Sequence, residues 1–234
     1  MKNSIKYIAG LFCLTLGLTS CEYDNYDEPK LLFEGNLVYQ GEPIGVSYND
    51  VYFELWEEGW QTFGNIGVAV DQDGSFSSLL FKGDYKLIIP ASQGPFMNIT
   101  NTETNSDTIP LNLRGSRNMN IEVLPYYMLR NVNISGNSSS VSADFGLEQI
   151  VTDSNAKSIN EVVLYLSKST FVDGRTSISS ARIGGGDISD MSNIQLSSNV
   201  PDMTPSQNYV FARVGVRING VEDMLFSPIE RIDF

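Results

Sequence analysis

The sequence of 234 residues contains no histidine and two cysteines, and its formal net charge is −13 at pH 7. Without an imidazole the chain cannot form a Ser-His-Asp or Cys-His catalytic site, and zinc sites normally need histidine or clustered cysteines. The acidic balance argues against nucleic acid as a partner, because such binding depends on clustered lysine and arginine. We expect a non-enzymatic protein with no cofactor and no bound metal.

Residues 1–21 have the organisation of a bacterial secretory signal that ends in a lipobox. Lys2 and Lys6 precede the apolar run Tyr7–Leu18, which is shorter than the roughly 20 apolar residues of a membrane-spanning helix. Small residues then lead to Cys21. This pattern predicts removal of residues 1–20 and lipidation of Cys21.

Cysteine usage favours lipidation over two alternatives, an unmodified cysteine after an ordinary signal peptide and a buried thiol. The other cysteine, Cys13, lies in the segment that is removed, so Cys21 has no intramolecular disulfide partner. An acylated terminal cysteine would hold the protein on a membrane. We therefore expect a lipid anchor in the outer membrane, with the protein facing the cell exterior.

The stretch Glu22–Lys30 is polar and acidic and contains a proline near its end, which predicts an extended tether. It resembles the acidic surface-export signal that follows the lipidated cysteine in lipoproteins of Bacteroidetes. An ordinary solvated linker is the alternative. Loss of Lys2 and Lys6 with the signal takes the formal charge from −13 to −15. The globular part is expected to start near Leu31.

From residue 31 onward, short alternating segments rich in Val, Ile, Tyr and Phe are separated by clusters of Gly, Asn, Asp and Ser. This pattern predicts an all-β chain of two β-sandwich domains. In the first half the predicted strands are Leu31–Tyr39, Val51–Trp56, Ile66–Val70, Ser75–Phe81, Tyr85–Pro90, Thr108–Leu113 and Met119–Leu124. In the second half they are Met128–Ser135, Ser139–Phe145, Glu161–Ser167, Asn193–Ser198, Tyr209–Ile218 and Met224–Ile232.

The boundary between the domains is expected at Leu124-Pro125-Tyr126, where a proline interrupts the strand pattern. The predicted domains are residues 31–124 and residues 125–234.

Four short motifs indicate the fold of the first domain: Gly35–Val38, Gly41–Ile44, Asp73–Phe76 and Gly83–Tyr85. The Asp73-Gly74 pair predicts a tight turn, after which Phe76 enters the core. Together these motifs resemble the carboxypeptidase-regulatory-like, transthyretin-like sandwich. That resemblance implies a structural or adhesive spacer rather than an enzyme.

Calcium ligation by Asp71 and Asp73 is an alternative to the turn, because carboxylates two residues apart can share one cation. A complete calcium loop needs glycine at its sixth position, where this sequence has Phe76. The turn is the favoured interpretation.

The second half ends in Tyr209–Val216, the pair Asn219-Gly220 and then Phe226-Ser227-Pro228. Asn-Gly is typical of a type I′ hairpin. The pattern resembles the end of a fibronectin type III or immunoglobulin-like sandwich, in which a tyrosine opens the penultimate strand and pins a corner.

The lipobox, acidic tether and two sandwich-like halves together resemble a family of Bacteroidetes surface lipoproteins of uncharacterised function. Members of that family tend to be encoded beside SusC-like and SusD-like outer-membrane proteins. The resemblance therefore implies these proteins and a glycan as partners, and a role as an accessory binding component of polysaccharide uptake. A fimbrial or matrix-like adhesive protein is the main alternative, and a carboxylate-dependent glycoside hydrolase is the third.

Sugar binding uses exposed aromatic faces flanked by acids and amides. Trp56 and Trp60 stand at the end of a predicted strand and in the following turn, and Tyr126 and Tyr127 form a second aromatic pair at the domain boundary. All four are candidate ligand-binding residues, and burial of Trp56 and of both tyrosines is the alternative. In addition, Asp107-Thr108-Ile109 resembles the O-glycosylation acceptor of Bacteroidetes, which makes Thr108 a candidate modification site.

Overall fold

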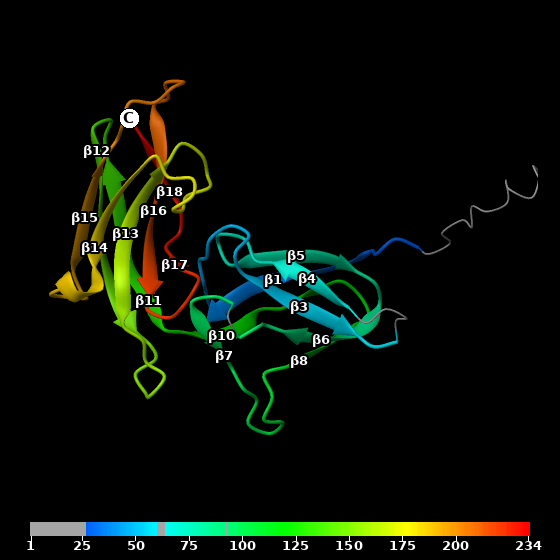
Figure 1. Ribbon diagram of the computed structural model, residues 1–234. Coiled ribbons are helices and arrows are strands. Elements are labelled where there is room, and N and C mark those ends of the chain that lie inside the picture. The colour runs from blue at the N-terminus through cyan, green and yellow to red at the C-terminus, as the bar shows by residue number, and fades with distance from the viewer. Residues whose placement is uncertain (1–26, 60–63, 92) are drawn as a thin grey trace, which may run out of the picture.

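A computed structural model describes residues 27–59, 64–91 and 93–234. Apart from one 3-10 turn, η1 (Gly185–Asp187), its regular elements are all β-strands. They form two domains, each built from two sheets (Figure 1). The predicted fold class, an all-β chain of two sandwich domains, is confirmed. The described residues include no helix with the length and hydropathy needed to cross a membrane.

In the N-terminal domain, one sheet is centred on β1 and the other on β3. The first has the order β2-β1-β10-β7, with β5 and β9 also pairing with β1; the second has the order β4-β3-β6-β8. The bounds of the first are β1 Leu31–Tyr39, β2 Glu42–Pro43, β5 Ser75–Leu80, β7 Phe96–Asn98, β9 Arg117–Asn118 and β10 Ile121–Pro125. Those of the second are β3 Tyr52–Glu57, β4 Asn65–Ala69, β6 Gly83–Ile88 and β8 Ile109–Leu113.

The C-terminal domain places the sheet β11-β12-β15 against the sheet β14-β13-β16-β17, in which β18 also pairs with β16. The bounds of the first sheet are β11 Tyr127–Gly136, β12 Ser140–Gln149 and β15 Ile194–Asn199. Those of the second are β13 Ile159–Ser167, β14 Ser179–Gly184, β16 Tyr209–Ile218, β17 Leu225–Phe226 and β18 Glu230–Asp233.

Aromatic rings join the two sheets of the N-terminal domain. Phe33 on β1 lies 6.3 Å from Phe53 on β3, and the Phe76 ring lies 5.2 Å from Phe33 and 4.9 Å from Phe53. All three side chains are buried, and so are Tyr85 and Leu87 on β6. This arrangement confirms the predicted inward position of Phe76, and the alternating burial along β6 follows from the two-residue period of a strand.

The turn before β5 is the one predicted from Asp73-Gly74. Gly74 has a φ of +85°, and a Cβ there would lie 2.5 Å from the carbonyl oxygen of Ile44. Asp71 accepts a hydrogen bond from the backbone N–H of Gln72 at 2.7 Å, and Asp73 accepts one from that of Ser75 at 2.9 Å. Both carboxylates therefore stabilise the turn, which supports that interpretation over calcium ligation.

The turn at Asn219-Gly220 differs from the predicted type I′ hairpin. A type I′ turn needs a positive φ at both central residues, and here Gly220 has a φ of +69° whereas Asn219 does not adopt a positive φ. The N–H of Val221 donates to the carbonyl of Ile218 at 3.2 Å. This geometry is that of a type II turn, in which glycine alone is left-handed.

The two domains meet along the segment from Glu42 to Asp50, which three arginines of the C-terminal domain contact. Arg130 pairs with Glu42 at 2.7 Å, and Arg175 pairs with Asp50 at 2.7 Å. Arg213 donates to the carbonyl of Val46 at 3.0 Å. Most of the buried apolar side chains of both domains also form one continuous cluster, and a second, smaller cluster lies within the C-terminal domain. The domains are therefore joined by a packed core as well as by polar contacts.

Arg213 is fully buried at this junction. Its Nε donates to the carbonyl of Val172, and its guanidinium carbon lies 3.8 Å from the centroid of the Phe226 ring. Among the described residues its Nη2 has no hydrogen-bond partner. Desolvation lowers the pKa of Arg213 from its ordinary 12.5 to about 10, so burial of this cation costs stability that the two carbonyl contacts partly offset.

Candidate functional site

The structure buries both tyrosines of the predicted aromatic pair. Tyr126 and Tyr127 are 8% and 4% exposed and belong to the core cluster. The hydroxyl of Tyr127 donates to the carbonyl of Lys157 at 2.8 Å, and the Lys157 ammonium lies 5.6 Å from the Tyr126 ring centroid. Protein atoms occupy these ring faces because the chain passes from one sandwich to the next here. This placement removes both residues from the candidate site.

Trp56 is half-buried on β3, and its indole N–H donates to Glu54 at 2.8 Å. It borders a shallow hollow of ≈ 710 Å³ in which Lys86 pairs with Glu58 and Arg114 pairs with Asp84. The predicted partner of Trp56, Trp60, lies outside the described residues. The Trp56–Trp60 platform therefore stays a prediction.

Thr108 is half-buried in the segment just before β8. Its backbone N–H donates to the hydroxyl of Ser106 at 3.1 Å, and the neighbouring Asp107 accepts a hydrogen bond from Asn98 at 2.9 Å. Its glycosylation stays a prediction. Cys21 and the signal segment lie outside the described residues.

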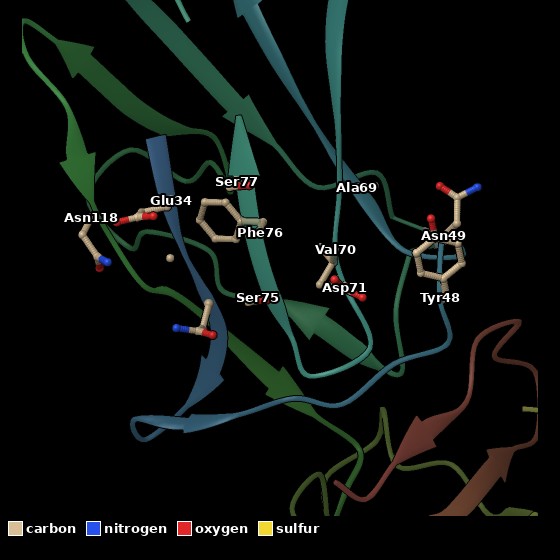
Figure 2. A pocket seen from close by; sticks show the side chains of 12 residues that line it. Glu34, Tyr48, Asn49, Ala69, Val70, Asp71, Ser75, Phe76, Ser77 and Asn118 are labelled. Carbon is tan, nitrogen blue, oxygen red and sulfur yellow. The ribbon is translucent and has the colours of Figure 1, made fainter. Parts of the chain in front are cut away.

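A polar groove of ≈ 460 Å³ crosses the outer face of the β9-β1-β5 strands (Figure 2). The strand register fixes its floor, because Glu34 of β1 stands opposite Ser77 of β5 and beside Asn118 of β9. Two residues further along β1, Asn36 stands opposite Ser75. We call this surface the serine groove; it is lined by Glu34, Gly35, Asn36, Tyr48, Asn49, Ala69, Val70, Asp71, Ser75, Phe76, Ser77 and Asn118.

Alternation along the strands explains why the floor is polar. Phe33 and Leu37 point into the sandwich, so Glu34 and Asn36 between them face outward. On β5 the buried Phe76 leaves Ser75 and Ser77 facing outward in the same way. Serine is short, and a row of serines on an edge strand produces a depression between larger side chains on either side.

The far wall of the groove comes from the loop between β2 and β3. Tyr48 is 47% exposed, and Asn49 has a φ of +61°, a left-handed conformation that asparagine tolerates better than most residues. Figure 2 shows Tyr48 and Asn49 on the side of the groove opposite Glu34 and Asn118. The groove thus offers an aromatic ring at one end and acids, amides and hydroxyls along its length.

The chemistry of this lining suits hydroxyl groups. Asn36, Asn49 and Asn118 each carry both a donor and an acceptor, the serines can do either, and Glu34 and Asp71 supply acceptors. In the part of the chain that the structure describes, neither lysine nor arginine lines the groove. Among the described residues no group of three or more carboxylates or cysteines is placed to hold a metal ion.

These residues were not predicted as a site from the sequence, although one signal pointed to the surface they share. The alternation of β1 and β5 already places Glu34, Asn36, Ser75 and Ser77 on outward faces. The pairing of β1 with β5 and β9, which brings them together, involves residues far apart in the chain and is visible only in the structure.

The fold is that of a two-domain β-sandwich protein with a polar groove on its N-terminal domain. The chain belongs to the DUF3823 family: residues 31–124 match the model of the protein of unknown function (DUF3823) N-terminal domain, and residues 127–231 match the domain of unknown function DUF3823_C.

Solved structures agree with this family membership. A DUF3823 family protein from Parabacteroides merdae is 31% identical, with a TM-score of 0.76, and the match covers 88% of this chain and 100% of that one. Another from Bacteroides ovatus is 28% identical, also with a TM-score of 0.76, and the match covers 87% and 99%. No protein of curated function matches the chain.

A protein of Bacteroides uniformis with a suggested role in carbohydrate binding is 15% identical, with a TM-score of 0.70 and coverage of 88% and 100%. At this identity the match shows a shared fold.

Proposed function

We propose that this protein is a lipid-anchored protein of the outer cell surface that binds carbohydrate without chemical conversion, as an accessory component of polysaccharide uptake. The observation that carries the proposal is the serine groove, which combines an exposed tyrosine ring with a lining of amides, hydroxyls and carboxylates. The lipobox at Cys21 and the acidic segment after it support the location.

Sugars present two kinds of surface, and the groove has a complement to each. The C–H groups on one face of a pyranose ring pack against an aromatic ring such as that of Tyr48. The hydroxyls need paired donors and acceptors when they leave water, which Asn36, Asn49 and Asn118 provide. The suggested carbohydrate-binding role of the Bacteroides uniformis protein with the same fold agrees with this chemistry.

Adhesion through an edge strand is the second candidate function. Strand β5 pairs with β1 on one side, and its Leu79 is 58% exposed, followed by Phe81 at 38%. Such an edge can pair with an extended segment of another chain. SusC-like and SusD-like proteins remain proposed partners of the carbohydrate-binding role.

Affinity electrophoresis through gels that contain starch, xylan, mixed-linkage β-glucan or galactomannan tests the proposal. The purified protein should be retarded by at least one of these uncharged polysaccharides. Tyr48→Ala and Asn36→Ala should restore free migration, because they remove the ring and an amide of the groove. Tyr52→Ala is the matched control, since Tyr52 is 39% exposed on the other sheet. Equal retardation of all variants would exclude the groove as the binding site.

A separate experiment tests the anchor. Growth of the native host with radiolabelled palmitate should label the protein, and Cys21→Ser should abolish the label and release the protein from the membrane fraction. A labelled Cys21→Ser variant would contradict lipidation at this cysteine.

A further inference from the structure

An aromatic side chain of the C-terminal domain lies beside the tyrosine of the serine groove. The rings of Tyr48 and Phe171 are 4.7 Å apart between centroids, with an interplanar angle of 64°. Both residues are exposed, at 47% and 41%. Two large exposed aromatic side chains in contact form a larger apolar surface than an isolated one, and here each domain supplies one ring.

Arg175 holds the two segments that carry these rings. Its Nη2 donates to the carbonyl of Tyr48 at 2.8 Å and its Nη1 to Asp50 at 2.7 Å, both in the N-terminal domain. Its Nε and Nη2 also donate to Asp173 of its own domain, at 3.2 and 2.8 Å. Every nitrogen of the guanidinium thus has a protein acceptor, so Arg175 fixes the position of the Tyr48 backbone rather than binding an anionic ligand.

A side chain next to the groove makes further contacts across the same junction. The amide of Gln72, which follows the groove residue Asp71, donates to the carbonyl of Thr170 at 3.1 Å and accepts from the N–H of Val172 at 3.3 Å. Gln72 therefore bonds the residue before Phe171 and the residue after it. The Phe171 backbone is therefore tied to the wall of the groove and not only to its own sandwich.

We propose that Tyr48 and Phe171 form a sugar-stacking subsite that extends the serine groove across the domain junction, and that Arg175 is its positioning residue. The subsite takes a pyranose ring of an uncharged polysaccharide. This inference rests on the proposed carbohydrate binding and adds that a longer sugar chain reaches the C-terminal domain, so affinity increases with chain length.

Calorimetric titration with an oligosaccharide series tests the subsite. The series is prepared from whichever of the four polysaccharides retards the protein. Phe171→Ala should lose about tenfold in affinity for the longest members, equivalent to about 1.4 kcal/mol, and remain close to wild type for the shortest. Tyr52→Ala is the control for loss of an exposed ring elsewhere.

The role of Arg175 needs a readout that global destabilisation would not give. Arg175→Ala should lose affinity for the long oligosaccharides and shift the ring resonances of Tyr48 in protein with ¹³C-labelled tyrosine, even without ligand. Arg175→Lys should recover part of both effects, since lysine reaches fewer of these acceptors. Arg182→Ala is the matched control, because that arginine is also exposed and pairs with Glu161 of its own domain.

The outcomes separate this inference from the function on which it rests. If wild type binds none of the four polysaccharides, both the proposed function and the subsite are wrong. If wild type binds but Phe171→Ala keeps the full gain in affinity with chain length, the subsite is wrong and carbohydrate binding stands. Unshifted Tyr48 resonances in Arg175→Ala would overturn the positioning role.

Discussion

The central strands of the two domains differ in how completely they are buried. In the C-terminal domain, β13 is buried without interruption from Val162 to Ser167, and β16 is buried from Ala212 to Val216. In the N-terminal domain, β1 and β3 alternate between buried and partly exposed positions. A strand covered on both faces presents little surface to a ligand, whereas an alternating strand presents one polar face.

Because of this difference in burial, the two domains have different structural roles. The N-terminal domain carries the groove on an open sheet face, and the C-terminal domain provides a more completely packed body against which the Glu42–Asp50 segment is held. The division predicts that core substitutions in either domain affect the whole molecule, whereas groove substitutions leave its stability nearly unchanged.

The largest effect is expected from truncation of the N-terminal core. Phe33→Ala should lower the free energy of unfolding by about 3–5 kcal/mol, because Phe33 is fully buried between Phe53 and Phe76. Leu164→Ala on β13 should cost about 2–5 kcal/mol. Since the core is continuous across the junction, urea denaturation should show one transition for both variants. Two separate transitions would show that the domains unfold independently.

Arg213→Met should have an intermediate effect. It should lower the free energy of unfolding by about 1–3 kcal/mol for each carbonyl left without its donor. The removal of a desolvated cation offsets part of this loss, so the net change measured by urea denaturation should be at the lower end. Arg231→Met is the control, because Arg231 is half-exposed over the Tyr209 ring and its loss should be nearly neutral. Greater stability of Arg213→Met would mean that the cost of burying the charge dominates.

The pH dependence of stability should report on Asp173 and Arg175. Burial acts to raise the pKa of Asp173, but its hydrogen bonds with Arg175 and Thr176 outweigh burial and leave the pKa below its usual value. An acid with a lowered folded-state pKa stabilises the fold above its unfolded-state pKa, and this stabilisation is lost as the pH falls through the folded-state pKa. As the pH is lowered below about 4, the free energy of unfolding should decrease less steeply for Arg175→Ala than for wild type. Parallel curves would contradict the coupling.

The smallest effect is expected from salt. If the groove binds uncharged sugars, a rise in ionic strength from about 0.1 M to about 1 M, which shortens the screening length from about 10 to about 3 Å, should change the affinity by less than about twofold. Glu34→Gln should also retain most of the affinity, because glutamine keeps an acceptor oxygen. Strong salt dependence in gel retardation would indicate a charged ligand instead.

Periodicity and turn signals were sufficient to predict much of the fold. The strands Leu31–Tyr39 and Tyr209–Ile218 have the bounds expected from their alternation, and they form β1 and β16. The predicted strand Met224–Ile232 is instead divided into β17 and β18, because Ser227 bonds the N–H of Val214 through its side chain and Pro228 lacks an N–H. Strand β14, Ser179–Gly184, was missed because its serines and glycine give little β signal.

The candidate site was less predictable, and the physical reason is its composition. Individual serines and asparagines are common on protein surfaces, so Ser75, Ser77 and Asn36 have no distinctive local pattern. Trp56 was predicted to bind ligand because it is a large aromatic residue. Alternation does not reveal that its indole N–H donates to Glu54 on the same strand. Phe171 belongs to a loop in the other half of the chain, and its proximity to Tyr48 depends on the packing of the two domains.

The contacts that arginines and Gln72 make across the junction have an evolutionary consequence. Several of them end on backbone oxygens, those of Val46, Tyr48 and Thr170, which are present whatever the side chain is. Mutations that replace Tyr48 or its neighbour Asn49 would therefore leave the attachment of the loop intact. We expect related proteins to retain the arginines while these two positions diversify, which would let one rigid scaffold acquire new ligand preferences through a few surface substitutions.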